Sequence, residues 1–411
     1  MSRTMFKTVV LSLLMGVTVS GNCNIQAKPD ENKNGFKDSL SLLDCSKLEA
    51  VKNKLEAPEY ANVYSDLVKS ANKQLEDKAL SVVQKTQIPP SGDKHDYISY
   101  GPYWWPNPDK LDGLPWIRKD GQINPLTREG NTDFESKNVM FGNITNLSLA
   151  YFFSDEEKYG KKALEFLKVW FVNNETKMNP NLNFAQGIPG INTGRGIGII
   201  EFAGVTNIIT AIEILELKNT IDKETSKQLR LWFTKYLYWL QTSENGIFEK
   251  NTKNNHGVWY DVQEVSILMF LNKNEEAKAV LETVKTKRIA TQIEPNGSQP
   301  HELARTKALS YSTMSLRGFT QLAYFGKRLG VDLWNYQAKN GASIKKAFEF
   351  LKPYALEEKK WEHQQISSVK KALQGLNSLF LMAGSQFNVG EYCAIGKPKD
   401  GVYSNLLYHC N

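Results

Sequence analysis

Apolar residues recur at helical spacing along most of the chain from about residue 40 onward. The clearest run falls at i, i+3, i+4, i+7, i+8 and i+11, on one face of a helix: Leu229, Trp232, Phe233, Tyr236, Leu237 and Leu240. The same pattern predicts helices near residues 60–84, 138–153, 157–173, 197–217, 224–242, 259–271, 274–286, 303–329, 341–351 and 364–384. Alternation of the strand type is nearly absent, so the sequence predicts an all-α protein.

The predicted helices are joined mostly by short polar loops, which is typical of antiparallel helix hairpins. Because no repeat of fixed period is visible, we favour a closed α/α toroid, an incomplete (α/α)6 or (α/α)7 barrel, over an open solenoid. Three longer stretches interrupt the helices, at 87–135, 173–196 and 243–257, and a polar turn occupies 294–300. Loops on a rigid scaffold commonly carry function, so we expect functional residues there.

The composition adds a weak preference for an anionic partner. The chain has 411 residues and a net charge of +7, from 51 Lys and Arg against 44 Asp and Glu. The basic residues are scattered rather than gathered in a block, which argues against a nucleic-acid partner and leaves an anionic polymer as the favoured one. No run approaches the ~18 apolar residues that cross a bilayer, so we expect no stable membrane span.

The first residues have the pattern of an export signal. Arg3 and Lys7 precede an apolar run at 9–19, and small and polar residues follow up to Ala27. This predicts a signal peptide at 1–27, a single mature domain at 28–411, and a periplasmic or secreted protein. Lipid attachment at Cys23 is the less favoured alternative, because Asn22 is a poor match to the small residue expected before a lipidated cysteine.

The cysteines outside this segment are Cys45, Cys393 and Cys410, and none has C-x-x-C spacing. A zinc ribbon and a thioredoxin-like site are therefore excluded. In an oxidising compartment we expect a disulfide between Cys393 and Cys410, with three unpaired structural cysteines as the alternative.

Searches for common catalytic motifs remove several classes of function. His301 and Glu302 begin an H-E-x-x-H zinc motif, but position 305 is Arg where the second His is required. The run from Gly194 to Gly198 lacks the spacing of a dinucleotide fingerprint, and no P-loop, nucleophile elbow or EF-hand loop occurs. The sequence thus predicts a protein without a metal or an organic cofactor.

Four polar residues remain as candidates for chemistry: Asn255, His256, Arg305 and Tyr311. Arg305 and Tyr311 are six residues apart, which is about 600° of rotation on a helix, so they point to different sides of it. They converge only if a helix begins near Arg305 or bends. A structural pair of a buried Tyr and an Arg is the alternative.

These residues resemble the catalytic signature of the alginate lyase superfamily, which includes polysaccharide lyase families 5 and 17. The runs Ser298–Thr306 (SQPHELART) and Tyr100–Pro106 (YGPYWWP) are especially similar to family 38. The resemblance extends over roughly residues 60–385. The Arg-to-Tyr spacing of six is one shorter than in family 5, and the second, β-rich domain of family 17 is missing.

The resemblance implies a lyase that cleaves a polyuronate by β-elimination, with polymannuronate-rich alginate and glucuronan as leading substrates. Such an enzyme removes the proton at C5, beside the carboxylate, and expels the oxygen at C4. In mannuronate and glucuronate both groups lie on one face of the ring, so Tyr311 serves as base and then acid in a syn elimination. Arg305 is expected to favour the phenolate, and Asn255 and His256 to neutralise the substrate carboxylate. For guluronate, His256 is the expected base.

Six further residues are predicted to bind the substrate: Tyr103, Trp104, Trp105, Asn192, Arg195 and His301. The three aromatic residues stand among prolines in a long loop and are suited to stacking on sugar rings, with loop packing as the alternative. Arg195 is suited to a further uronate, although an ion pair with the nearby Glu201 competes with that role.

Two rival functions remain open. A glycoside hydrolase on a similar toroid needs two carboxylates across the cleft, for which Glu201, Asp261 and Glu264 are candidates. A non-catalytic glycan-binding protein needs the aromatic residues but not the Asn, His, Arg and Tyr set.

Overall fold

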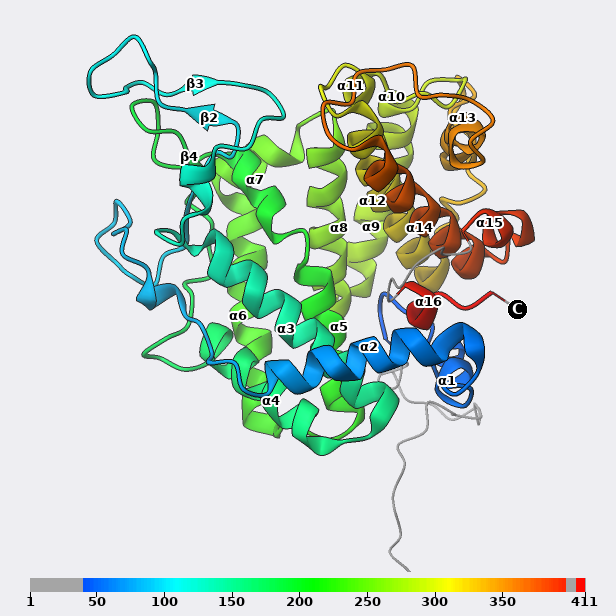
Figure 1. Cartoon of the computed structure of the whole chain (residues 1–411), viewed down its shortest axis with the longest axis horizontal. Coiled ribbons are helices and arrows are strands. Elements are labelled where there is room, and N and C mark those ends of the chain that lie inside the picture. Colours follow the sequence, from blue (N-terminus) through cyan, green and yellow to red (C-terminus); the bar gives the residue numbers. More distant parts are fainter. Residues whose placement is uncertain (1–39, 397–403, 411) are drawn as a thin grey trace, which may run out of the picture.

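The computed structural model describes residues 40–396 and 404–410, and this part of the chain is mainly helical (Figure 1). The helices are α1 (Cys45–Lys52), α2 (Pro58–Gln74), α3 (Asp133–Ser154), α4 (Glu157–Phe171), α5 (Val205–Leu217), α6 (Lys223–Thr242), α7 (Glu244–Lys250), α8 (Asn255–Phe270), α9 (Asn274–Val284), α10 (Ala290–Gln292), α11 (Pro300–Leu303), α12 (Ala308–Leu329), α13 (Ile344–Ala355), α14 (Val369–Phe387), α15 (Gly390–Ile395) and α16 (Ser404–Leu407). The all-α prediction is confirmed.

The helices form two layers of a toroid. An inner series packs in the order α3, α5, α8, α12 and α14, and the outer helices α4, α6, α9 and α13 lie against it. The inner helices are apolar on more than one face because they are covered on both sides; in α8 every residue except His256 is buried. Between α14 and α3 the ring passes through α16 and α2. The structure is therefore the helical toroid expected from the sequence.

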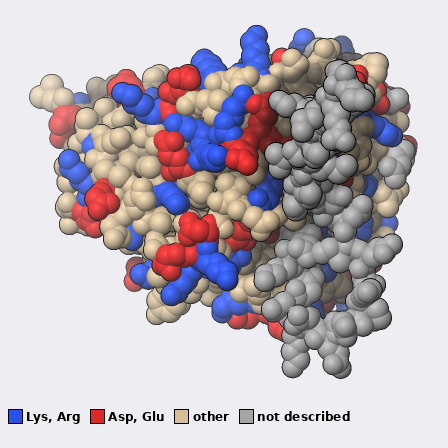
Figure 2. Space-filling model, turned by 90° about the horizontal axis from the view of Figure 1, so that it is seen from below, with Lys and Arg blue, Asp and Glu red and all other residues tan. Residues whose placement is uncertain are grey.

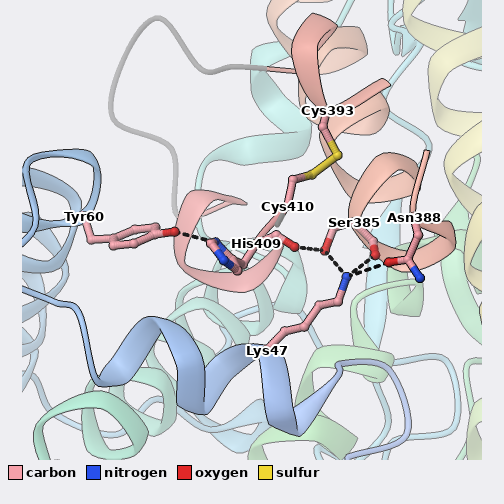
Figure 3. The surroundings of a disulfide bond; sticks show 7 residues. All are labelled: Lys47, Tyr60, Ser385, Asn388, Cys393, His409 and Cys410. Carbon is pink, nitrogen blue, oxygen red and sulfur yellow. Dashed lines mark hydrogen bonds between the residues drawn. A yellow bond between two sulfur atoms is a disulfide. The ribbon is translucent and has the colours of Figure 1, made fainter. Parts of the chain in front are cut away.

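A disulfide fastens the C-terminal segment that closes this ring (Figure 3). Cys393 in α15 is bonded to Cys410, as predicted, and none of the cysteines in the described residues is free. The neighbouring His409 Nδ1 lies 2.5 Å from Tyr60 Oη of α2. The tail thus joins α15 to α2 and so links the two ends of the helical series. The predicted signal peptide and Cys23 lie outside the described residues.

Short strands order the first two long loops. β1 (Ile98–Tyr100) pairs in parallel with β4 (Phe184–Gly187), and β2 (Trp104–Trp105) pairs antiparallel with β3 (Ile117–Arg118). The β2–β3 hairpin and β4 lie on the opposite side of the molecule from α15 and α16 (Figure 1). The hairpin therefore brings the aromatic loop to one end of the toroid, where the first turns of α8 and α12 also lie.

Several predicted boundaries were wrong. The third long stretch is not a loop throughout, because Ser243 accepts a hydrogen bond from the Gly246 amide and caps α7. The helix predicted at 197–217 consists of a 3-10 segment, Gly196–Phe202, followed by α5, and the helix predicted at 303–329 begins only at Ala308. The helix predicted at 60–84 ends at Gln74.

One stretch in the described residues, Gly196–Leu217, is long and apolar enough by composition to cross a membrane, although 67% of its most apolar window is buried inside the protein. This is the environment of a core helix.

Candidate active site

Arg305 and Tyr311 meet because α12 begins after Arg305. Arg305 lies in the turn between α11 and α12, where it is free of helical spacing and folds back over Tyr311. Its Nη2 donates a hydrogen bond to Tyr311 Oη at 3.0 Å, and its Cζ lies 4.0 Å from the centre of the Tyr311 ring. Arg305 and Tyr311 therefore converge, which their spacing in the sequence alone did not decide.

Asp120, from the turn after β3, holds the same guanidinium. Arg305 donates from Nη2 to Asp120 Oδ1 at 2.9 Å and from Nε to Oδ2 at 3.2 Å, a bidentate ion pair. Thr306 Oγ1 donates to the same carboxylate at 3.0 Å. These contacts fix the guanidinium plane beside Tyr311.

Tyr103 reaches the same point from the aromatic loop. Its hydroxyl lies 2.6 Å from Tyr311 Oη, and Lys307 Nζ lies 5.5 Å from the centre of its ring. Burial is the largest cause that raises the pKa of Tyr311 well above the ordinary value for tyrosine, and Tyr103 raises it further. Arg305 lowers it, as expected, but is outweighed. Arg305 thus acts on Tyr311 in the expected direction, towards the phenolate, but burial and Tyr103 leave the pKa of Tyr311 raised overall.

Asn255 is oriented by a buried carboxylate that the sequence did not single out. Glu302 accepts hydrogen bonds from the Asn255 backbone N–H at 2.6 Å and from its Nδ2 at 2.7 Å. Asn255 and Glu302 are 1% and 2% exposed, and Asn255 Oδ1 has no partner. The backbone oxygen of Glu302 also accepts from the Arg305 amide at 3.1 Å. Glu302 therefore joins the start of α8 to the turn that carries Arg305.

His256, in the first turn of α8, is held by a second buried carboxylate. Its Nδ1 lies 2.7 Å from Glu249 Oε1, and Glu249 is completely buried. Asn254 caps α8 by accepting a hydrogen bond from the His256 amide. Since Glu249 occupies Nδ1, the imidazole has only Nε2 available for a ligand.

The other predicted binding residues are more dispersed. Trp104 and Trp105 form β2 and are partly exposed, and Arg195 Cζ lies 5.9 Å from the centre of the Trp104 ring. Arg195 donates to the backbone and side-chain oxygens of Gln186, both at 3.0 Å, rather than to Glu201. Burial lowers the pKa of Arg195 from its usual value. The aromatic strand and Arg195 thus form one surface beside Tyr103.

Asn192 and His301 do not join this group. Asn192 is exposed and lines a cavity of about 420 Å³ together with Tyr100 and Ile191, in which none of the four proposed catalytic residues takes part. His301 is exposed on α11, and within the described residues no hydrogen bond or ion pair ties it to the catalytic group. The part of the chain that the structure describes contains no cluster of three or more His, Cys, Asp or Glu arranged for a metal ion.

The carboxylates considered for a hydrolase are engaged elsewhere. Asp261 forms a buried bidentate pair with Arg288, at 2.7 and 3.0 Å. Glu201 accepts from Tyr97 and Ser99, and Glu264 accepts from Gln241. Each is buried among its own donors, so these carboxylates do not form an opposed pair across a cleft.

Comparison with known proteins identifies the family. The sequence model of the alginate lyase family matches residues 81–361, more than half of the chain. The chain belongs to the alginate lyase family. The match covers the aromatic loop, the first turn of α8 and the Arg305 turn. The protein is therefore a polysaccharide lyase, and its helical toroid is the fold of a family member.

Solved structures agree with this assignment. An alginate lyase from Bacteroides ovatus is 38% identical, with a TM-score of 0.86 over 91% of this chain and 100% of that one. A histidine-to-alanine variant of alginate lyase A1-III, complexed with a tetrasaccharide, is 17% identical, with a TM-score of 0.56 over 92% of this chain and 99% of that one. The second likeness concerns the fold alone. A search of curated proteins finds no match.

Sequence reasoning missed the three acidic residues that orient the candidate catalytic groups: Asp120, Glu249 and Glu302. Glu302 stands within the SQPHELART run, and Glu249 precedes His256 by seven residues. Asp120 is 185 residues from Arg305, and no local signal connects them. In this member of the alginate lyase family, Asn255, His256 and Arg305 thus each have an acidic partner.

Proposed function

We propose that this polysaccharide lyase cleaves a polyuronate by metal-independent syn β-elimination, with Tyr311 as base and acid. Polymannuronate-rich alginate and glucuronan are the leading substrates. The observation that carries the proposal is the contact of Tyr311 Oη with Arg305 at 3.0 Å, close in the chain to Glu302 of α11, which accepts from Asn255. This arrangement supports the proposal because it combines a hydroxyl suited to proton transfer with donors suited to a carboxylate.

The proposed reaction balances without an external reactant. Tyr311 oxygen accepts the proton from C5, the electron pair of that bond forms the C4–C5 double bond, and the bond from C4 to its oxygen breaks. The same proton then passes to the departing oxygen, so Tyr311 ends in its initial state. Arg305, Asn255 and His256 stabilise the charge that develops on the substrate carboxylate.

Proton removal at C5 requires the phenolate, which is scarce because the pKa of Tyr311 is raised. We therefore expect kcat/KM to rise with pH through the neutral range. A plateau already reached below about pH 8 would assign the base to another group, and His256 is the candidate for guluronate, where the proton and the oxygen lie on opposite faces.

The ligand and the compartment belong to the same proposal. The relative A1-III is complexed with a tetrasaccharide, which supports an oligosaccharide or polysaccharide ligand here. The partly exposed rings of Trp104 and Trp105, with Arg195 beside them, are suited to an anionic sugar chain. Secretion to the periplasm or beyond is supported by the signal-like pattern at 1–27 and by the Cys393–Cys410 disulfide.

The test is absorbance near ~235 nm, which detects the unsaturated product of elimination, across a panel of alginate blocks, glucuronan and neutral glycans. Tyr311→Phe should retain less than a tenth of the wild-type kcat, because only the proton-transferring oxygen is removed. EDTA should leave activity unchanged. Absence of the product from every uronate, or activity lost with EDTA and restored by a divalent ion, would refute the proposal.

A further inference from the structure

We propose that Asp120 is a positioning residue of this enzyme, which fixes Arg305 against Tyr311 and partly neutralises the guanidinium charge that Tyr311 experiences. The inference rests on the proposed role of Tyr311 in proton transfer. Asp120 is contributed by the aromatic loop, and Arg305 and Tyr311 by the turn before α12 and by α12 itself. The ion pair between Asp120 and Arg305 therefore connects two parts of the chain that are far apart in sequence.

One nitrogen atom connects the two oxygen atoms concerned. Arg305 Nη2 donates to Asp120 Oδ1 at 2.9 Å and to Tyr311 Oη at 3.0 Å. The carboxylate and phenol oxygens are consequently no more than about 6 Å apart, a distance at which unit charges interact appreciably even at an effective dielectric constant of about 20. A change in the charge of Asp120 must therefore change the electrostatic energy of the Tyr311 phenolate.

The backbone brings Asp120 into this position through a close approach. Gly121 follows it with a φ of +73°, and a Cβ atom at Gly121 would lie 2.3 Å from Thr306 Oγ1. Only glycine allows the turn to sit so close to the residue next to Arg305. The preceding Lys119 amide donates to the Tyr103 backbone oxygen at 2.8 Å. The docked turn thus also sets the approach of Tyr103 to Tyr311.

The charges around the pair support this role. Burial alone would raise the pKa of Asp120, but hydrogen bonds and charge from Arg305, with further bonds from Thr306 and Arg118, hold it below the usual range. Asp120 therefore stays ionised and raises the pKa of Tyr311, against the opposite effect of Arg305. The titratable and charged groups that face this cluster are Tyr103, Lys307, Arg118 and Glu302.

The experiment compares Asp120→Asn, which removes the charge, with Asp120→Glu, which keeps it. Asp109→Asn, an exposed carboxylate on the same hairpin, is the matched control. In Asp120→Asn the pH at which kcat/KM levels off should fall by about one unit, with a lower maximal kcat, because Arg305 is then uncompensated and less firmly held. Asp120→Glu should keep the wild-type pH at which the profile levels off even if kcat decreases, and Asp109→Asn should match wild type throughout.

A direct titration separates this inference from the proposed function. The difference in phenolate absorbance near ~295 nm between each enzyme and its Tyr311→Phe counterpart reports Tyr311 alone. At one alkaline pH, Asp120→Asn should increase the ionised fraction of Tyr311 about tenfold. An unchanged fraction in a folded Asp120→Asn protein would overturn the inference. An increased fraction without a shift in the pH profile would support the role of Asp120 but refute Tyr311 as the base.

Discussion

Glu302→Gln is the most informative single change, because it alters the hydrogen-bond acceptor of Asn255 while Asn255 itself stays the same. The carboxylate accepts from the Asn255 backbone N–H at 2.6 Å and from Nδ2 at 2.7 Å. A glutamine amide has one acceptor oxygen, so one of the two Asn255 donors must face an NH2 group. We therefore expect the Asn255 side chain to lose its fixed orientation.

The size of the effect follows from the lost bond. A hydrogen bond to a charged group contributes about 1.5–3 kcal/mol, and a loss of about 2 kcal/mol from transition-state stabilisation lowers kcat about 30-fold. Stability should change less. Burial raises the pKa of Glu302, so burying its charge costs free energy, and the neutral amide removes that cost. The thermal midpoint should therefore fall by less than about 5 °C.

A double-mutant cycle measured at ~235 nm gives the decisive result. Asn255→Ala alone should lower kcat by ~10²–10³, the usual cost of losing one such donor. If Glu302 acts through Asn255, the double variant should be no slower than Asn255→Ala. Glu294→Gln, an exposed carboxylate in the neighbouring turn, is the control and should retain wild-type kcat. If the loss of kcat in the double variant equals the product of the losses in the two single variants, the reasoning is refuted.

Three further predictions concern binding, pH and the tail. Trp104→Ala should chiefly raise KM, whereas His256→Ala should chiefly lower kcat and penalise the free acid more than its methyl ester; equal penalties would exclude carboxylate neutralisation. Burial raises the pKa of Glu213 from 4.5 to about 7, so its proton favours the folded state and that stability is lost as pH rises through this range. Urea unfolding should show this fall in wild type and a flatter curve in Glu213→Gln, and parallel curves would contradict it. Cys393→Ser should lower the unfolding free energy by about 3 kcal/mol, because the disulfide closes a loop of 17 residues, and should leave kcat unchanged. A lower kcat in the folded variant would connect the tail to the site.

The helices were predictable because burial of one helix face requires apolar residues at helical spacing, and this spacing is visible in the sequence. The stripe from Leu229 to Leu240 marks the buried face of α6, with Trp232 and Phe233 among the buried residues. Element ends were less predictable, because they depend on capping contacts. Ser243 starts α7 within a stretch that composition alone assigns to a loop.

The site was predictable in its residue types but not in its geometry, and the start of α12 explains the difference. The Ala308 amide donates to the backbone oxygen of Gln364 at 2.9 Å, and the Leu309 amide donates to Gln365 Oε1 at 3.1 Å. A segment 55 residues away thus satisfies amides that would otherwise be unpaired at the first turn of the helix. This contact keeps Arg305 outside the helix and lets it fold onto Tyr311. No local sequence pattern encodes a cap from so far away. The six-residue spacing therefore predicted that Arg305 and Tyr311 point to different sides of one helix. In the folded chain only Tyr311 is in the helix, so the same spacing lets the two side chains meet.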